Sequence, residues 1–304
     1  MKPTDASGAI FAALTTGLTA MGVLLASRPG WWSWAAGELL LGAALVEWFI
    51  LLHECGHGTL FRTRRWHTAV GHIAAFFALI PFQTWKRVHQ RHHKWTGWQD
   101  VDPTTATLVP RPLSGFERVL VNVCWRYWIP LFATLYRLNN FWNVPRLFRL
   151  FDAAPVRRRL VINTAVMVVA YAAVVTAVGP AMFARVAIAA CVVAFIVEDV
   201  LLISQHTHIP MGLSHGQAVD PYPTLAQEPF TRSMRLPRLL SRAALHFDAH
   251  ELHHMYPFVP GYRLGQVPYA PGNEVSWWRW VPAARSVQGA VLLFQNRNDT
   301  GFDV

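Results

Sequence analysis

The chain has 304 residues, of which 53% are hydrophobic and only 14% are charged, and it contains 14 tryptophans. Soluble domains average roughly 25% charged residues, so this composition excludes an ordinary soluble globule. A formal net charge of +10 would suit nucleic acid. In an apolar chain, however, basic residues more often flank membrane spans on the cytoplasmic side. We therefore expect a membrane protein that does not bind nucleic acid.

Four apolar runs are long enough to cross a bilayer, for which roughly 20 residues suffice. They lie at 8–26, 31–52, 160–178 and 182–203. The short links at 27–30 and 179–181 predict two helical hairpins. Nearly all Lys and Arg fall on one side of these hairpins, and the positive-inside rule makes that side, with both termini, cytoplasmic. We predict an all-α integral membrane protein with four transmembrane helices, in a single domain over 1–304, and a cytoplasmic helical cap formed by 53–159 and 204–304.

Two weaker apolar stretches fall within the predicted cap. The stretch at 68–82 is short and is predicted to be a re-entrant or cap helix. The stretch at 119–138 carries arginines and aromatic residues, and it is predicted to be one helix lying at the membrane interface. The three cysteines are far apart, so we expect buried thiols and no disulfide framework.

Three histidine boxes stand out among the 14 histidines. They read HECGH at 53–57, HQRHH at 89–93 and HELHH at 250–254. Residues at i, i+3 and i+4 share one face of a helix, so we expect each box to present its imidazoles in one direction. The histidines of the boxes are His53, His57, His89, His92, His93, His250, His253 and His254. Neutral imidazole binds iron, zinc and copper, and these residues exceed the needs of one ion, so we predict a site for two metals.

Two other classes of protein remain open at this point. Box one also reads H-E-x-x-H, in which Glu54 would be the general base of a zinc protease. That alternative leaves the other two boxes without a role. A metal transporter with histidine relays is the second alternative, but it would carry metal-binding groups along the spans, whereas these boxes cluster at one end of them.

The boxes and their flanks resemble the three histidine boxes of membrane fatty acid desaturases. The matching segments are HECGHGTLF, WKRVHQRHHKWTG and HELHHMYPFVPGYRL, and the order and spacing resemble that family over roughly 35–265. The resemblance implies an oxygen-dependent di-iron oxidoreductase that introduces a double bond into a fatty acyl or similar hydrophobic chain. It implies two iron ions, dioxygen as co-substrate, a hydrophobic acyl-type substrate, and contact with membrane lipid.

The sequence leaves the electron donor and the outcome of the reaction open. No redox domain is visible, so electrons would come from a separate donor such as a ferredoxin. Related hydroxylases, ketolases, acetylenases and an alkene-forming decarboxylase have similar boxes and are alternatives to desaturation. We expect the bacterial inner membrane as the location.

The resembled family usually has one more metal ligand between the fourth span and the third box. In this chain the segment at 205–208 occupies that position, and His206 matches the family's Gln-His pattern. His206 is therefore the predicted ninth ligand, with His208 as the second choice.

Three further residues are candidates for supporting roles. Asp199 lies two helical turns before His206 and could orient that imidazole, or it is an ordinary interfacial aspartate. Glu47 lies within the second span, where ionisable groups are costly and often functional, although a hydrogen bond to a neighbouring helix would also explain it. His246 is four residues before His250 and could extend the same face.

Overall fold

The computed structural model describes residues 1–302. These residues are mostly helical, which confirms the predicted all-α class, and they include one parallel pair of short strands. The chain forms two compact units: unit 1 comprises Met1, Val88–Ala133 and the described residues from Asp199, and unit 2 comprises Lys2–Arg87 and Thr134–Glu198. The single-domain arrangement stays a prediction.

Four helices in the described chain are long and apolar enough to cross a membrane, and each contains one predicted span. They are α1 (Asp5–Ser27), α2 (Trp31–His57), α8 (Ala154–Val178) and α9 (Pro180–His206). Each helix extends beyond its apolar run, because a helix continues until a cap or a break ends it. Helix α2 ends at Gly58, whose φ of 76° glycine adopts without strain. The additional turns of α2 carry box one.

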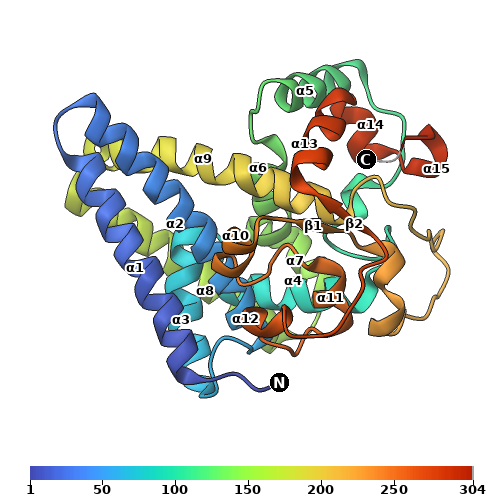
Figure 1. The fold of residues 1–304 in the computed structure, drawn as a ribbon, viewed down its shortest axis with the longest axis horizontal. Helices are drawn as coiled ribbons and strands as arrows, with labels where there is room; N and C mark the ends of the chain where they lie inside the picture. Colours follow the sequence, from blue (N-terminus) through green and yellow to red (C-terminus); the bar gives the residue numbers. More distant parts are fainter. Residues whose placement is uncertain (303–304) are drawn as a thin grey trace. The chain divides into compact units, whose positions relative to one another are not determined.

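Helices α1 and α2 run side by side within unit 2 (Figure 1). Glycines allow the two backbones to approach closely, as in many membrane helix pairs. A Cβ atom at Gly37 would lie 2.2 Å from the backbone nitrogen of Ala26, and one at Gly22 would lie 2.8 Å from that of Leu41. The contact therefore depends on the absence of side chains at these two positions.

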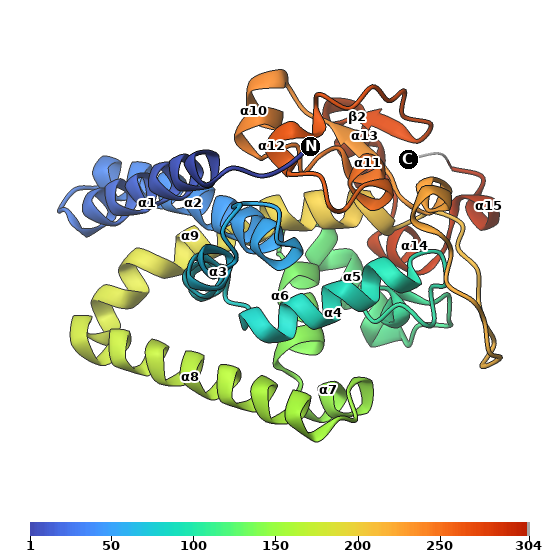
Figure 2. The same ribbon diagram turned by 90° about the horizontal axis from the view of Figure 1, so that it is seen from below.

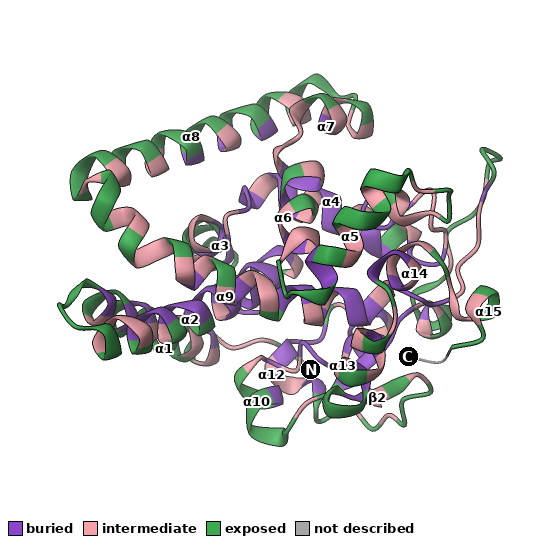
Figure 3. Cartoon of the chain, turned by 90° about the horizontal axis from the view of Figure 1, so that it is seen from above, coloured by how far each residue is buried: buried purple, intermediate pink, exposed green. Residues whose placement is uncertain are grey.

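Helices α8 and α9 are joined at Gly179 and diverge from that turn (Figure 2). Helix α8 is exposed along most of its length (Figure 3). At the start of α9, Arg185 donates hydrogen bonds to the carbonyl oxygens of Ala26 and Arg28, at 3.2 and 3.0 Å. The link between α1 and α2 and the link between α8 and α9 therefore lie at the same end of unit 2.

The weaker stretch at 68–82 forms α3 (Arg64–Ala78), which is followed by α4 (Phe82–Trp95) after a bend of 93°. Leu79 at the bend has a φ of 57°. The two helices together are apolar enough for a broken span or a re-entrant loop. Helix α4 begins in unit 2, ends in unit 1 and carries box two.

The stretch at 119–138 does not form one helix, so that part of the prediction was wrong. It forms α5 (Gly115–Arg126) and α6 (Leu131–Arg137). Pro130 lies between them and has no N–H for a continuous helix. Trp128, in the same link, has a φ of 59°, which also ends the helical path.

Short elements complete both units. In unit 2 they are η2 (Leu138–Trp142, a π-helical turn) and α7 (Val144–Leu150). In unit 1 they are η1 (Ala106–Leu108), η3 (Thr224–Ala226), η4 (Glu228–Phe230), β1 (Ser233–Arg235), α10 (Arg238–Ala243), α11 (His250–Met255), α12 (Gly261–Leu264), β2 (Glu274–Ser276), α13 (Trp277–Ser286), α14 (Gly289–Phe294) and α15 (Arg297–Thr300).

The strand pair holds the helix that carries box three. Strand β1 is parallel to β2, with Ser233 opposite Glu274. The backbone N–H of Glu251 in α11 donates to Ser233 Oγ at 3.1 Å. Its carboxylate accepts a hydrogen bond from the backbone N–H of Asn273 at 2.7 Å. The starting ends of the two strands therefore fix α11 within unit 1.

Candidate metal centre

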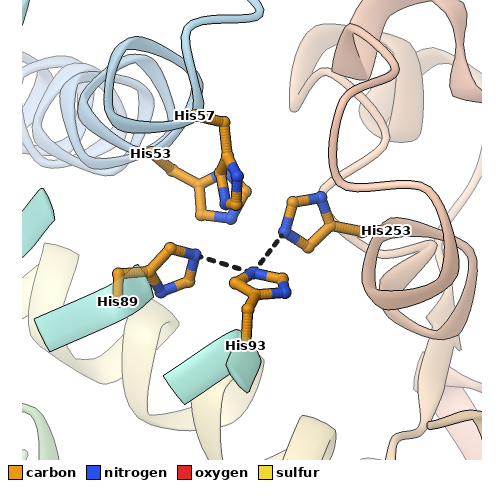
Figure 4. A group of neighbouring side chains, drawn as sticks. All are labelled: His53, His57, His89, His93 and His253. Atoms are coloured by element: carbon orange, nitrogen blue, oxygen red, sulfur yellow. Dashed lines mark hydrogen bonds between the residues drawn. The ribbon is translucent and has the colours of Figure 1, made fainter. Parts of the chain in front are cut away.

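Box one lies in the last turns of α2, in unit 2, and supplies two neighbouring imidazoles. His53 and His57 are one helical turn apart, and their ring centroids are 4.7 Å from each other (Figure 4). Glu54 Oε1 lies 3.3 Å from His53 Nδ1, and Glu54 Oε2 accepts a hydrogen bond from Thr59 Oγ1 at 2.8 Å. The ring of Trp85 meets that of His53 edge-on, at 5.6 Å between centroids. A carboxylate and an indole therefore fix the orientation of His53.

Box two, on α4, sends its three imidazoles to two different groups within unit 1. His89 Nε2 and His93 Nε2 lie 3.0 Å apart, and His93 Nε2 lies 3.1 Å from His253 Nε2 of box three (Figure 4). We call these residues the three-histidine group. His92 belongs to the other group, because neighbouring residues are rotated by about 100° around a helix. The prediction that each box presents its imidazoles in one direction was therefore wrong for box two. It was also wrong for box three, because His253 joins the three-histidine group while His250 and His254 join the other group.

The second group in unit 1 contains four imidazoles whose ligand nitrogens all lie within 4.8 Å of one another. This four-histidine group consists of His92, His206, His250 and His254. The Nε2 atoms of His206 and His250 are 2.8 Å apart. The ring of His254 stacks on that of His93 at 4.2 Å between centroids. The two groups of unit 1 are therefore adjacent, and box three contributes to both.

Asp102 and Thr104 determine how His92 is oriented. His92 Nδ1 donates to Asp102 Oδ2 at 2.7 Å, and Asp102 Oδ1 accepts hydrogen bonds from the hydroxyl and the backbone N–H of Thr104, at 2.9 and 2.8 Å. Burial opposes ionisation of Asp102, but the neighbouring His92 and these hydrogen bonds hold the pKa of Asp102 below its ordinary value. With Nδ1 engaged in this way, Nε2 is the ligand atom that His92 offers.

Gln227 and Phe230 face the Nδ1 atoms of two more imidazoles, those of His254 and His206. His254 Nδ1 donates to Gln227 Oε1 at 3.0 Å, and Gln227 Nε2 donates to the carbonyl oxygen of His93 at 2.8 Å. His206 Nδ1 faces the carbonyl oxygen of Phe230 at 3.3 Å. Gln227 therefore links the two imidazole groups.

Sequence reasoning missed Asp102, Thr104 and Gln227. Asp102 and Thr104 lie in the Asp-Pro-Thr-Thr run soon after box two, which was the available signal for a carboxylate near the box. Gln227 lies in a loop without periodicity and had no comparable signal.

His254 shows that the four-histidine group suits a metal ion. Its Nε2 atom is buried and has no hydrogen-bond partner among the described residues. Burial also lowers the pKa of His254 well below its ordinary value, so the ring is neutral and Nε2 keeps its lone pair. An unsatisfied buried acceptor costs about 1–3 kcal/mol. A metal ion bound to Nε2 would remove that cost.

His208 lies outside both groups. It follows the end of α9 with a φ of 58°, and its ring is directed toward the C-terminal segment. His208 Nδ1 donates to the carbonyl oxygen of Gln295 at 3.1 Å, and Nε2 lies 2.8 Å from Thr300 Oγ1. Of the two candidates for the extra ligand, the structure brings His206 into the four-histidine group.

The remaining candidates also lie outside the two groups. Asp199 Oδ1 accepts a hydrogen bond from the backbone N–H of Ala133 at 2.5 Å, and Phe230 rather than Asp199 faces His206 Nδ1. His246 Nδ1 lies 3.0 Å from Ser241 Oγ. Glu47 lies in the body of α2, nearly two turns before box one.

Fold and site together define a helical protein with a histidine-rich candidate metal centre. The model of the fatty acid desaturase family matches residues 29–274. The chain therefore belongs to the fatty acid desaturase family, which confirms the resemblance of its three boxes.

Individual relatives match shorter stretches. An sn-1 oleoyl-lipid 12-desaturase of Picosynechococcus is 33% identical over 87 residues, which cover 29% of this chain and 25% of the relative. An sn-1 acyl-lipid omega-3 desaturase (ferredoxin) of Synechocystis is 26% identical over 113 residues, covering 36% and 30%. An acyl-lipid omega-3 desaturase (cytochrome b5) of the endoplasmic reticulum from Arabidopsis thaliana is 28% identical over 131 residues, covering 42% and 33%. The chain thus aligns with only a quarter to a third of each relative.

Proposed function

We propose that the chain is an integral membrane di-iron enzyme that uses dioxygen to introduce a double bond into the acyl chain of a lipid. The observation that carries the proposal is the pair of adjacent imidazole groups in unit 1, with the buried, unsatisfied Nε2 of His254 in one of them. Membership of the fatty acid desaturase family and the names of the three relatives support the reaction class.

The proposed ligands of the two irons are the nine predicted histidines. The four-histidine group would hold one iron, and the three-histidine group would hold the other together with box one. Box one is assigned there because His53 and His57 share a helix face and would give that iron enough imidazoles. The proposed metal ligands are His53, His57, His89, His92, His93, His206, His250, His253 and His254.

When bound, the irons would supply the oxidising power needed to remove hydrogen from an unactivated methylene. Overall, one dioxygen, two electrons and two protons would convert two adjacent CH₂ groups into a double bond and release two waters. The residues behind the ligands keep each ring in one orientation: Glu54 does so for His53, Asp102 for His92 and Gln227 for His254. The electrons would come from a separate small protein of the ferredoxin type, since one relative's name specifies ferredoxin.

The arrangement of Glu54 argues against the zinc-protease alternative. In that alternative Glu54 would act as general base on a metal-bound water. Here one carboxylate oxygen faces His53 Nδ1 and the other accepts a hydrogen bond from Thr59. This carboxylate is therefore placed to orient an imidazole.

The proposal includes a membrane orientation. The links at 28–30 and 179–181 lie at one end of unit 2 and carry or adjoin few basic residues, chiefly Arg28 and Arg185. Nearly all other basic residues lie in the segments that the boxes occupy. By the positive-inside rule, the boxes and both termini would be cytoplasmic, in a bacterial inner membrane.

Metal analysis and lipid analysis together test this function. The purified chain should hold close to two irons. Cells that express it under ¹⁸O₂ should contain a new acyl double bond without ¹⁸O, whereas cells expressing the His92→Ala variant should not. One tightly bound zinc and no iron would contradict the di-iron centre. An ¹⁸O-labelled alcohol would show that the reaction is hydroxylation and not desaturation.

A further inference from the structure

Helix α5 of unit 1 has an apolar face that no described residue covers. Its large side chains are exposed, with Phe116 at 76% and Val119 at 62%. The exposed residues recur at helical spacing and so lie along one face. We call this face the α5 stripe; it consists of Phe116, Val119, Leu120, Val123 and Tyr127. Figure 3 shows the exposure of this helix.

The opposite face of α5 is firmly packed, so the stripe cannot turn inward. Trp125 is buried, and its Nε1 donates to the carbonyl oxygen of Ala284 in α13 at 3.1 Å. Asn122 Oδ1 accepts a hydrogen bond from the backbone N–H of Ala290 in α14 at 2.9 Å. A Cβ atom at Gly289 would lie 2.7 Å from Trp125 Cβ, so α14 and α5 are in close contact. These contacts fix which side of α5 faces outward.

Basic and aromatic side chains border the stripe. Arg126 is exposed on α5 one turn after Val123, beside the stripe, and a long arginine side chain can reach lipid phosphates while its stem covers apolar surface. Arg118 is also exposed, but at about 100° per residue it points away from the stripe. Beyond the helix, Trp128 is exposed, and the guanidinium carbon of Arg285 lies 4.0 Å from the centroid of its ring. The guanidinium of Arg285 also donates to the carbonyl oxygen of Arg126 at 2.6 Å. The end of the stripe is therefore a rigid assembly of arginine and tryptophan.

This combination of features fits a lipid surface. Helices that lie in the interface combine an apolar face containing Phe, Leu or Trp with arginines on the polar side. Exposed arginines complement anionic headgroups, and tryptophan and tyrosine are favoured at headgroup level. We infer that the α5 stripe lies in the headgroup region of the membrane, with its apolar side chains in the acyl boundary and Arg126 at the phosphates. This inference rests on the proposed membrane insertion.

Site-specific labelling in lipid nanodiscs tests the inference in the full-length chain. A bimane label is placed at Val119→Cys, with Arg118→Cys as the matched control. The background variant carries Cys191→Ala, since the other two cysteines are buried. The Val119 label should be quenched by brominated acyl chains at least about twofold more than the Arg118 label, and iodide in the water should quench it less. Equal iodide quenching of the two labels would overturn the inference.

A third label separates failure of this inference from failure of the proposed membrane insertion. Val169 is exposed on α8, one of the four candidate spans. Quenching by brominated lipid at Val169→Cys but not at Val119→Cys would leave the insertion standing and refute the role of the stripe. No lipid quenching at either position would refute both. Energy transfer between Val119 labels on different chains, with no lipid quenching there, would identify a second copy as the occupant and overturn the lipid assignment.

Discussion

A carboxylate that is itself held by a threonine stands behind one imidazole in each of the first two boxes. Glu54 is held by Thr59 and faces His53, and Asp102 is held by Thr104 and accepts the hydrogen bond of His92. A fixed acceptor at Nδ1 selects the tautomer that leaves Nε2 for the metal, and it raises the basicity of the ring. These residues should therefore affect metal affinity without contacting the metal.

Replacing Asp102 by Asn should weaken iron binding about 10–100-fold, because the buried charge behind His92 is lost while the size of the side chain is kept. Iron titration of the metal-free variant measures this change. Asp100→Asn is the matched control, since the Asp100 carboxylate accepts its hydrogen bonds from the backbone N–H and the hydroxyl of Ser214. Equal affinities for the two variants would refute the role given to Asp102.

The His206→Ala and His208→Ala variants should differ in metal content. Loss of His206 removes a member of the four-histidine group, so iron per chain should fall from about two toward one and turnover should cease. Loss of His208 breaks hydrogen bonds to Gln295 and Thr300, so the C-terminal segment should exchange amide hydrogens faster while iron is retained. Metal analysis and hydrogen exchange on folded protein decide the case. Full iron in His206→Ala would exclude it as a ligand.

The buried His254 should make the metal-free protein sensitive to mild acid. Burial lowers the pKa of His254 in the folded state, whereas the unfolded chain takes up a proton at this residue near pH 6.5. Its contribution to stability is therefore complete above about pH 6.5 and is lost as the pH falls, by at most about 1.4 kcal/mol per pH unit. Thermal unfolding in detergent at pH 7.5 and 5.5 should show this loss. The His254→Gln variant should lose less stability between pH 7.5 and 5.5 than the unsubstituted protein. Equal losses in the two proteins would contradict this assignment.

At the scale of helices, the sequence predicted what local patterns encode. Long apolar runs predicted the four candidate spans, and the i, i+3, i+4 spacing predicted helical boxes. The distribution of the imidazoles between two groups depends on contacts far apart in the chain, such as that between His93 and His253, which are 160 residues apart. Gln227 was missed for the same reason, since an aperiodic loop gives no signal of what it will contact. The predicted continuous helix at 119–138 was wrong because Pro130 interrupts the apolar pattern on which the prediction rested.

The contact between α1 and α2 gives a prediction at this scale. Gly37→Ala should lower the free energy of unfolding by roughly 1–3 kcal/mol, because its methyl group would meet the backbone of Ala26. Gly17→Ala is the matched control in α1, where a Cβ atom meets nothing within 4 Å. That control should be neutral or stabilising by up to about 1 kcal/mol. Thermal unfolding of both variants in one detergent measures the difference, and equal stabilities would refute the close contact.

For the whole molecule, the proposed orientation predicts which segments can be labelled from outside the cell. Cysteines introduced at 28–30 and 179–181 should react with a membrane-impermeant reagent in intact cells. Cysteines introduced at 94–98, next to box two, should react only after the cells are broken. Labelling at 94–98 in intact cells would contradict the orientation. If no segment is labelled in intact cells, the two links are not external.

The four-histidine group also has a consequence for the order in which the protein is made. Its members are dispersed from His92 to His254, and α11 is held in place through Asn273. At about 5–20 residues per second, the 160 residues that separate His93 from His253 of the adjacent three-histidine group take on the order of 8–32 s to synthesise. No complete group can exist until that synthesis is finished, whereas the histidines of box one and box two emerge early. Under the proposed function, metal would therefore be acquired late, after translation has passed the third box.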